Sequence, residues 1–225
     1  MIGHGVLVSK SMTLTYVSLL LLLSFAGCGK ERVPSVSPAK PDYVSLNSTA
    51  WYIMYSGGMP QHPFPAQDAA WSMPLPTAPG SVHYVQTPFQ SSFAPKMITI
   101  TFRLNSSQDA AYNGLVDPDA GDPATFHLFL ERQGDDLTKE CYRWWSKDGG
   151  YTLGSEDNSV VTIQVPLTSD RWTDVDGNHN EEEFNRTLNN LAWVGMTFGG
   201  RRYWGHGVNM AFGSADFVLL DFRLE

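Results

Sequence analysis

The chain has 225 residues and carries 15 Lys and Arg against 23 Asp and Glu, which gives a formal net charge of −8 at pH 7. An acidic surface repels polyanions and the sequence contains no basic patch, so we expect no nucleic-acid partner. The length suffices for one domain with a sizeable core and is short for two.

Residues 1–27 have the composition of an export signal. A lysine is followed by an apolar run over residues 12–25 that is too short to span a bilayer. Ala26 and Gly27 are the small residues that a signal peptidase requires. With Cys28 directly after them, these residues resemble the lipobox of bacterial lipoproteins.

This resemblance implies that the thiol of Cys28 is acylated, with palmitate as one of the lipids, and that Cys28 becomes the mature N-terminus held in the membrane of the bacterial cell envelope. Phe25 departs from the pattern, because an aliphatic residue is usual there. Gly29 is not the aspartate that commonly retains lipoproteins at the inner membrane, which favours the outer membrane and leaves open which side the domain faces. A plain secretory signal and an uncleaved anchor helix are the alternatives.

Residues 28–46 are rich in Pro, Ser and charge and show no apolar periodicity. This composition predicts an extended tether between the lipid and a folded domain over residues 47–225. The only cysteines are Cys28 and Cys141. Acylation of Cys28 would leave Cys141 without a partner in the chain, so we expect no disulfide and a buried thiol.

The domain has the period-two pattern of β-strands. Apolar and polar residues alternate most clearly in four segments, 97–104, 126–131, 161–165 and 218–224. Further strands are expected at 47–55, 81–86, 141–147, 191–198 and 207–212. The Pro-broken stretch to about residue 80 carries Phe64, Trp71 and Met73, and we expect it to be an ordered flap lying on the domain.

One segment, residues 181–190, has the pattern of a helix. Phe184 and Leu188 are four residues apart, acidic residues occupy the first turn, and Asn180 is a candidate cap. About nine short strands with one short helix predict an all-β fold, a jelly-roll β-sandwich of antiparallel strands.

An acidic loop precedes this helix. Asp174, Asp176 and Asn178 alternate around Gly177, and converging oxygens of this kind are what a calcium ion requires. The loop departs from the helix-loop-helix calcium pattern, because Gly177 comes two places early. A solvated turn leading into the helix is the favoured interpretation, and the second acidic loop, residues 117–122, is interpreted in the same way.

The polar sides of the expected strands indicate a ligand-binding surface. They would gather Arg103, His127, Glu131, Arg143, Gln164 and Thr197. The many aromatic residues suit sugar rings, whose apolar C–H faces stack on aromatic side chains. Trp144 and Trp145 are adjacent in one strand and must point to opposite faces, so one belongs to the core and the other is a candidate for stacking. The alternative is an ordinary water-facing side of an antiparallel sheet.

A glycine-rich segment over residues 198–208 predicts a tight turn between two strands. The turn would display Arg201, Arg202, Tyr203 and His206, of which Arg201 and Tyr203 are second candidates for ligand binding. The segment lacks the lysine-serine ending of a phosphate-binding loop.

No signature of an enzyme is present: Gly-x-Ser-x-Gly, His-Glu-x-x-His and a paired acid on one strand are all missing. We therefore expect a non-catalytic protein. A glycoside hydrolase with carboxylates on separate strands remains an alternative, because sequence does not reveal such pairs.

The positions of tryptophan, glycine and phenylalanine between Trp172 and Phe217 resemble the C-terminal half of galactose-binding-like β-sandwiches, a group that includes many non-catalytic carbohydrate-binding modules. The resemblance implies the fold and makes a structural calcium ion worth testing, but it contains no residue diagnostic of a sugar. The resulting hypothesis is a lipoprotein that binds a glycan or similar polar ligand. A structural or assembly lipoprotein that binds a protein partner through the aromatic flap is the alternative.

Overall fold

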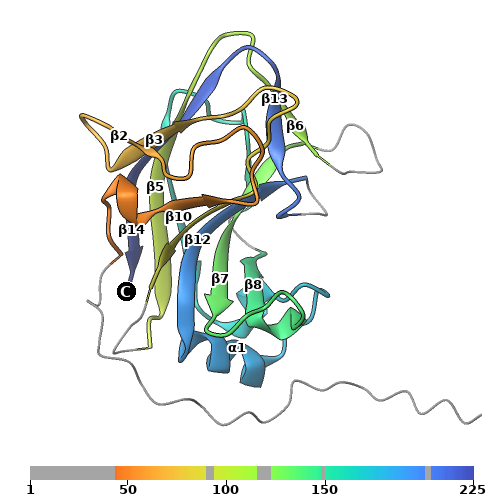
Figure 1. The fold of residues 1–225 in the computed structure, drawn as a ribbon. Coiled ribbons are helices and arrows are strands. Elements are labelled where there is room, and N and C mark those ends of the chain that lie inside the picture. Colours follow the sequence, from red (N-terminus) through yellow and green to blue (C-terminus); the bar gives the residue numbers. More distant parts are fainter. Residues whose placement is uncertain (1–43, 90–93, 116–122, 148–149, 201–203) are drawn as a thin grey trace, which may run out of the picture. The chain divides into compact units, whose positions relative to one another are not determined.

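The computed structural model describes residues 44–89, 94–115, 123–147, 150–200 and 204–225. Over these residues the chain forms antiparallel sheets and a single α-helix, which confirms the all-β class (Figure 1). The export signal, Cys28 and the acidic loop 117–122 lie outside the described residues. No helix in the described ranges is long and apolar enough to cross a membrane.

The largest sheet has seven strands. In spatial order they are β1 (Tyr52–Met54), β4 (Tyr84–Pro88), β12 (Leu191–Gly199), β7 (Thr125–Arg132), β8 (Arg143–Ser146) and β11 (Trp172–Thr173), with β9 (Tyr151–Thr152) also paired to β7. Its centre is the long antiparallel pairing of β12 with β7.

The second sheet has five strands. Their order is β10 (Val160–Pro166), β5 (Met97–Ser106), β14 (Ala215–Leu224), β3 (Trp71–Pro74) and β2 (Phe64–Pro65). A further pair joins β13 (Val208–Phe212) to β6 (Ala111–Gly114). The other elements are helix α1 (Glu181–Leu188) and three 3-10 turns, at Ser48–Ala50, Glu140–Tyr142 and Ser169–Arg171.

The described residues contain fourteen strands, where about nine were expected. Much of the difference comes from strands of two to four residues, such as β9 and β11. Two expected strands also begin late, because 3-10 turns occupy Ser48–Ala50 before β1 and Glu140–Tyr142 before β8.

The two large sheets pack through an aromatic core. The alternation expected from the sequence holds over residues 100–104 of β5, whereas in β7 both faces are buried, because His127 and Phe129 are covered as well as Phe126, Leu128 and Leu130. Phe102 on β5 stacks on Phe217 of β14, with ring centroids 5.2 Å apart, and meets Phe126 of β7 edge-on at 4.9 Å. Phe102 and Phe126 come from different sheets, so these contacts join the two layers.

The stretch expected to be a flap is part of a sheet. Strands β2 and β3 pair with each other, and β3 pairs with β14 at the edge of the five-stranded sheet. Trp71 and Met73 are completely buried in the core, whereas Phe64 is half exposed. The flap prediction was therefore wrong, because the period-two spacing of Trp71, Met73 and Leu75 already had the pattern of a strand.

The N-terminal part of the described chain also belongs to this core. Val44, which was placed in the tether, is buried among the core residues. The indole nitrogen of Trp51 donates a hydrogen bond to the carbonyl of Ser45 at 2.7 Å. The packed domain therefore begins a few residues earlier than expected.

The helix forms as expected. The side chain of Asn180 accepts a hydrogen bond from the backbone N–H of Glu183 at 3.1 Å, which caps α1, and Phe184 and Leu188 are buried. A buried ion pair of 3.1 Å joins Glu183 to Arg132 of β7 and fixes the helix against the end of the seven-stranded sheet. Removing one partner of such a pair would leave a buried charge uncompensated.

Cys141 differs from the expectation in two ways. It is only half-buried, and it is disulfide-bonded. No described cysteine is free. The sequence contains one other cysteine, Cys28. The prediction of an unpaired, buried thiol at Cys141 was therefore wrong, since strand-like residues around a cysteine do not reveal its covalent partner.

We expect Phe217→Ala to lower the free energy of unfolding by about 3–5 kcal/mol, because Phe217 contacts aromatic rings of both sheets. Urea denaturation followed by tryptophan fluorescence measures the change. Phe212→Ala is the matched control: Phe212 is 71% exposed, and its loss should change stability by no more than about 0.5 kcal/mol. Equal effects of the two variants would contradict this account of the core.

Candidate functional site

The outer face, meaning the side of the seven-stranded sheet that points away from the core, carries the candidate site. Directly paired residues of antiparallel strands point to the same side of a sheet, so the register defines this face. Its rows are Tyr84–Thr197–His127, Gln86–Gly195–Phe129–Trp145 and Trp193–Glu131–Arg143. Five of the predicted residues therefore lie on one surface: His127, Glu131, Arg143, Trp145 and Thr197.

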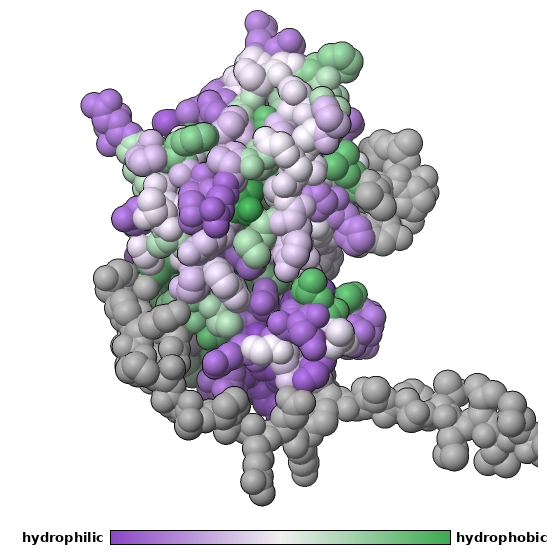
Figure 2. Space-filling view, in the orientation of Figure 1, coloured by the Kyte–Doolittle hydropathy of each residue, from purple (hydrophilic) through white to green (hydrophobic). Residues whose placement is uncertain are grey.

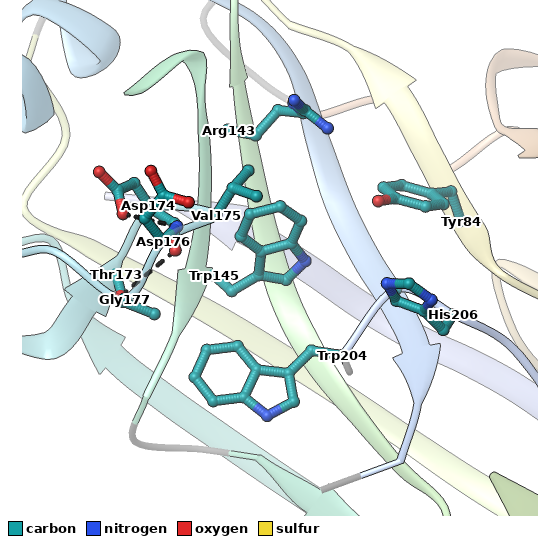
Figure 3. Close-up of a pocket in the computed structure, with 11 residues that line it drawn as sticks. Tyr84, Arg143, Trp145, Thr173, Asp174, Val175, Asp176, Gly177, Trp204 and His206 are labelled. Carbon is teal, nitrogen blue, oxygen red and sulfur yellow. Dashed lines mark hydrogen bonds between the residues drawn. The ribbon is translucent and has the colours of Figure 1, made fainter. Parts of the chain in front are cut away.

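A cleft of about 410 Å³ opens on the outer face. It is lined by Tyr84, Arg143, Trp145, residues 173–177 and residues 204–206. Figure 3 shows Trp145 between Arg143 and Trp204, with Tyr84 and His206 on one side and the loop of Asp174 and Asp176 on the other. The cleft thus combines aromatic rings with charged and polar groups, which is typical of sites for small polar ligands.

The two adjacent tryptophans point in opposite directions, as expected. Trp144 is completely buried, packs edge-on against Phe184 at 5.0 Å and donates from its indole nitrogen to the carbonyl of Cys141 at 2.9 Å. Trp145 lies on the outer face, packs against Phe129 at 5.3 Å and lines the cleft. Trp144 therefore serves the core, whereas Trp145, although only 7% exposed, is the one of the two that lines the cleft.

His127 supports one wall of the cleft. Its Nδ1–H donates to the carbonyl of Ser146 at 2.8 Å, and its ring stacks on the indole of Trp204 with centroids 4.3 Å apart. Burial lowers the pKa of His127 to about 4, although the Ser146 hydrogen bond acts in the opposite direction. The imidazole is therefore neutral at pH 7 and presents a flat ring that holds Trp204 in place.

Acidic and basic groups meet beside the cleft. Arg143 Nε lies 3.1 Å from the Asp135 carboxylate, in an ion pair without hydrogen-bond alignment, and Arg143 Nη2 donates to the carbonyl of Leu137 at 3.2 Å. Burial and the nearby Asp135 raise the pKa of Glu131 to about 7, against the opposing effect of Arg143. Burial also raises the pKa of Asp135 in spite of its ion pair. Desolvation thus outweighs the single guanidinium at both carboxyl groups.

An aromatic series crosses the outer face. Tyr55 meets Tyr84 edge-on at 5.4 Å, Tyr84 meets Phe129 at 5.2 Å, and Phe129 packs against Trp145. Gly205 lies directly against the Tyr84 hydroxyl, and a Cβ there would be 2.6 Å from it. A glycine at this position therefore lets the loop after residue 203 close over Tyr84.

Three buried polar atoms of the outer face have no hydrogen-bond partner in the described part of the chain: Gln86 Oε1, Thr197 Oγ1 and Trp145 Nε1. Each such atom costs about 1–3 kcal/mol if it stays unpaired. Buried polar atoms of this kind call for an explanation such as bound water or a polar ligand.

Two predicted site residues lie elsewhere. Arg103 and Gln164 belong to β5 and β10 of the five-stranded sheet, where they alternate with core residues and point away from the core. The core separates them from the outer face of the other sheet, so the prediction of one continuous polar surface was wrong for these two. Sequence alternation shows which residues point outward but does not show on which layer.

The acidic loop is held together by its own hydrogen bonds. Asp174 Oδ1 accepts from the backbone N–H groups of Asp176 and Asn178 at 3.0 and 2.8 Å, and Asp174 Oδ2 accepts from the Asn178 amide at 3.3 Å. Within the described ranges no group of three or more His, Cys, Asp and Glu side chains is arranged for a metal ion. The contacts are those of a turn that supports one wall of the cleft, and a calcium site here stays a prediction.

Part of the glycine-rich segment, residues 204–206, lines the cleft. Arg201 and Tyr203 lie outside the described residues, whereas Trp204 and His206 line the cleft. Sequence reasoning also missed Tyr84, Gln86, Asp135 and Tyr55 as members of the site. The strand assignment of residues 81–86 already placed Tyr84 and Gln86 on one side, which is the signal that could have identified them.

A second hollow, of about 530 Å³, lies at the end of β14. Val44, Leu46, Phe222 and Leu224 make most of its wall, and the arginine there is paired with Asp221 and Glu225. No residue of this hollow carries a buried polar atom without a partner. The cleft on the outer face is therefore the stronger candidate for polar recognition.

We expect Glu131→Gln to stabilise the protein at pH 8 and to have little effect at pH 4. The folded-state pKa is raised from 4.5 to about 7, so deprotonation penalises the folded state increasingly as pH rises through this window. The gain at pH 8 should be about 2–3 kcal/mol, measured by urea denaturation at both pH values. Glu156→Gln, at an exposed position, is the control, and equal changes at pH 4 and pH 8 would contradict the burial effect.

The chain was compared with known proteins. No protein-family model matches it, and a search of curated proteins found no match. The cleft and the residues that line it are therefore what indicates the function of this chain.

Proposed function

We propose that this domain binds a glycan in the cleft of the outer face, without catalysis, as part of a membrane-anchored lipoprotein. The observation that carries the proposal is the arrangement of Trp145, Trp204 and Tyr84 around one cleft together with Arg143 and His206. Aromatic rings bury the apolar C–H faces of sugars, while polar side chains bind the hydroxyl groups. The unpaired indole nitrogen of Trp145, which lines the cleft, adds support, since it favours a polar ligand.

The arrangement of acids favours binding over hydrolysis. A glycoside hydrolase needs two carboxyl groups that flank the scissile bond. The side chain of Asp135 is completely buried and paired with Arg143, so it cannot reach a substrate, and Asp174 is engaged by its own loop. Of the carboxyl groups that line the cleft this leaves Asp176, which would have to act as both acid and base, because Glu131 lies on the outer face and does not line the cleft.

A protein partner receives less support. Exposed large apolar residues such as Phe64, Val160 and Phe212 lie on different strands. The face shown in Figure 2 has small, separate apolar groups among polar residues. Docking surfaces for proteins usually form larger contiguous apolar patches.

The path of the chain supports a jelly-roll β-sandwich. The main strands alternate between the two large sheets in sequence order, from β4 to β5, β7, β10, β12 and β14. Antiparallel strands that cross repeatedly between two packed sheets are the hallmark of that fold. Carbohydrate-binding modules often use such a sandwich, which agrees with the proposed ligand.

We expect Trp204→Ala and Trp145→Ala to weaken glycan binding by about 1–3 kcal/mol each, by analogy with stacking on aromatic side chains. The domain from residue 44 onward is screened on a glycan array, and affinities for the bound glycan are measured by calorimetry. Trp193→Ala is the matched control: Trp193 lies on the same face, packs on Tyr52 and does not line the cleft. A domain that binds no glycan, or three variants that bind equally, would overturn the proposal.

The lipid anchor is tested separately. Cys28→Ala in the full-length chain should abolish palmitate labelling in a bacterial host and leave uncleaved precursor, because acylation precedes cleavage. Cys141→Ser is the matched control and should keep the label. Persistent labelling of Cys28→Ala would rule out Cys28 as the lipid site.

The disulfide at Cys141 provides a second test of the lipid anchor, because this bond and a lipid on Cys28 exclude each other within one chain. The sequence offers Cys28 as the one other cysteine, and one sulfur atom cannot carry both a thioether-linked lipid and a disulfide. In palmitate-labelled protein the thiol of Cys141 should therefore react with iodoacetamide without prior reduction. Monomeric protein in which Cys141 reacts only after reduction would contradict the lipoprotein proposal.

A further inference from the structure

Two residues with large side chains have a strained backbone conformation. Three non-glycine residues in the described ranges have positive φ angles: Tyr55 (φ 57), Leu137 (φ 67) and Asn158 (φ 64). Asparagine adopts this left-handed conformation readily, whereas large side chains do so at a cost. Tyr55 and Leu137 are therefore the two unusual positions.

Both residues are largely exposed. Tyr55 is 59% exposed and Leu137 is 52% exposed, so neither contributes much to the core. The Leu137 carbonyl accepts a hydrogen bond from Arg143 at 3.2 Å. Burial and the charges of Glu131 and Asp135 raise the pKa of Tyr55, while the charge of Arg143 lowers it.

Tyr55 also connects to the cleft through direct contact. Its ring packs edge-on against Tyr84 at 5.4 Å, and Tyr84 lines the cleft. A strained backbone at an exposed aromatic residue does not stabilise the fold, so it indicates that the residue has a functional role. Tyr84 and Phe129 connect this position to Trp145 through ring contacts of 5.2 and 5.3 Å.

We propose that Tyr55 is a second stacking position, and that the ligand is an oligosaccharide chain extending from Trp145 and Trp204 past Tyr84 to Tyr55. This inference rests on the proposed function and specifies its ligand: an internal stretch of a glycan chain. A single sugar would fill only the cleft, and additional units would gain contact with Tyr55.

The experiment measures the dependence of affinity on chain length. Cello-, chito-, xylo- and manno-oligosaccharides from monomer to hexamer are titrated against the wild-type domain and against Tyr55→Gly. For the series that binds, wild-type affinity should rise at least about tenfold from monomer to tetramer, and Tyr55→Gly should lose most of this increase while it keeps monomer binding. Phe212→Ala, which removes an equally exposed aromatic residue from β13, should behave as wild type.

A second readout tests the strain. Glycine adopts positive φ without penalty, so Tyr55→Gly should raise the melting temperature or leave it unchanged. A lower melting temperature would show that the tyrosine serves the fold and would overturn the inference. A monosaccharide that binds as tightly as the tetrasaccharide would also overturn the inference, and so would an unchanged dependence of affinity on chain length in Tyr55→Gly. Both outcomes leave the proposed function unaffected. Absence of binding to every series would overturn the proposed function together with the inference.

Discussion

The aromatic contact between the two large sheets determines which side of each central strand faces outward. Phe102, Phe217 and Phe126 pack with ring centroids 4.9–5.7 Å apart and join β5 and β14 to β7. Because the inner side of β7 is committed to this core, its other side must face outward. His127, Phe129 and Glu131 are thereby placed on the outer face at fixed spacing.

The candidate site is thus a rigid sheet surface completed by loops. The sheet provides Trp145, Arg143 and Tyr84 in fixed register, while the loops over residues 173–177 and 204–206 provide the walls. The hydrogen bonds of Asp174 hold the first loop, and the stack of Trp204 on His127 holds the second. A site built in this way needs little reorganisation to bind a ligand, which limits the entropy cost of association.

Burial controls the charge of this surface. It lowers the pKa of His127 to about 4 and raises the pKa of Glu131 to about 7, so at pH 7 His127 is neutral and Glu131 is only partly ionised. Arg143 is compensated by Asp135. Burial thus reduces the charge of this part of the surface, even though the chain as a whole is acidic.

Four features could be predicted from the amino-acid sequence: the all-β class, most strand positions, the helix with its Asn180 cap, and the opposite directions of Trp144 and Trp145. These features follow from periodicity and capping, which act over a few neighbouring residues. Three others became visible only in the folded chain: Arg103 lies on the other sheet from Glu131, β3 joins a sheet through β14, and Tyr84 and Trp204 meet at one cleft. Strand order and the pairing of distant residues depend on long-range packing, and local patterns are the same for either layer of a two-layered fold.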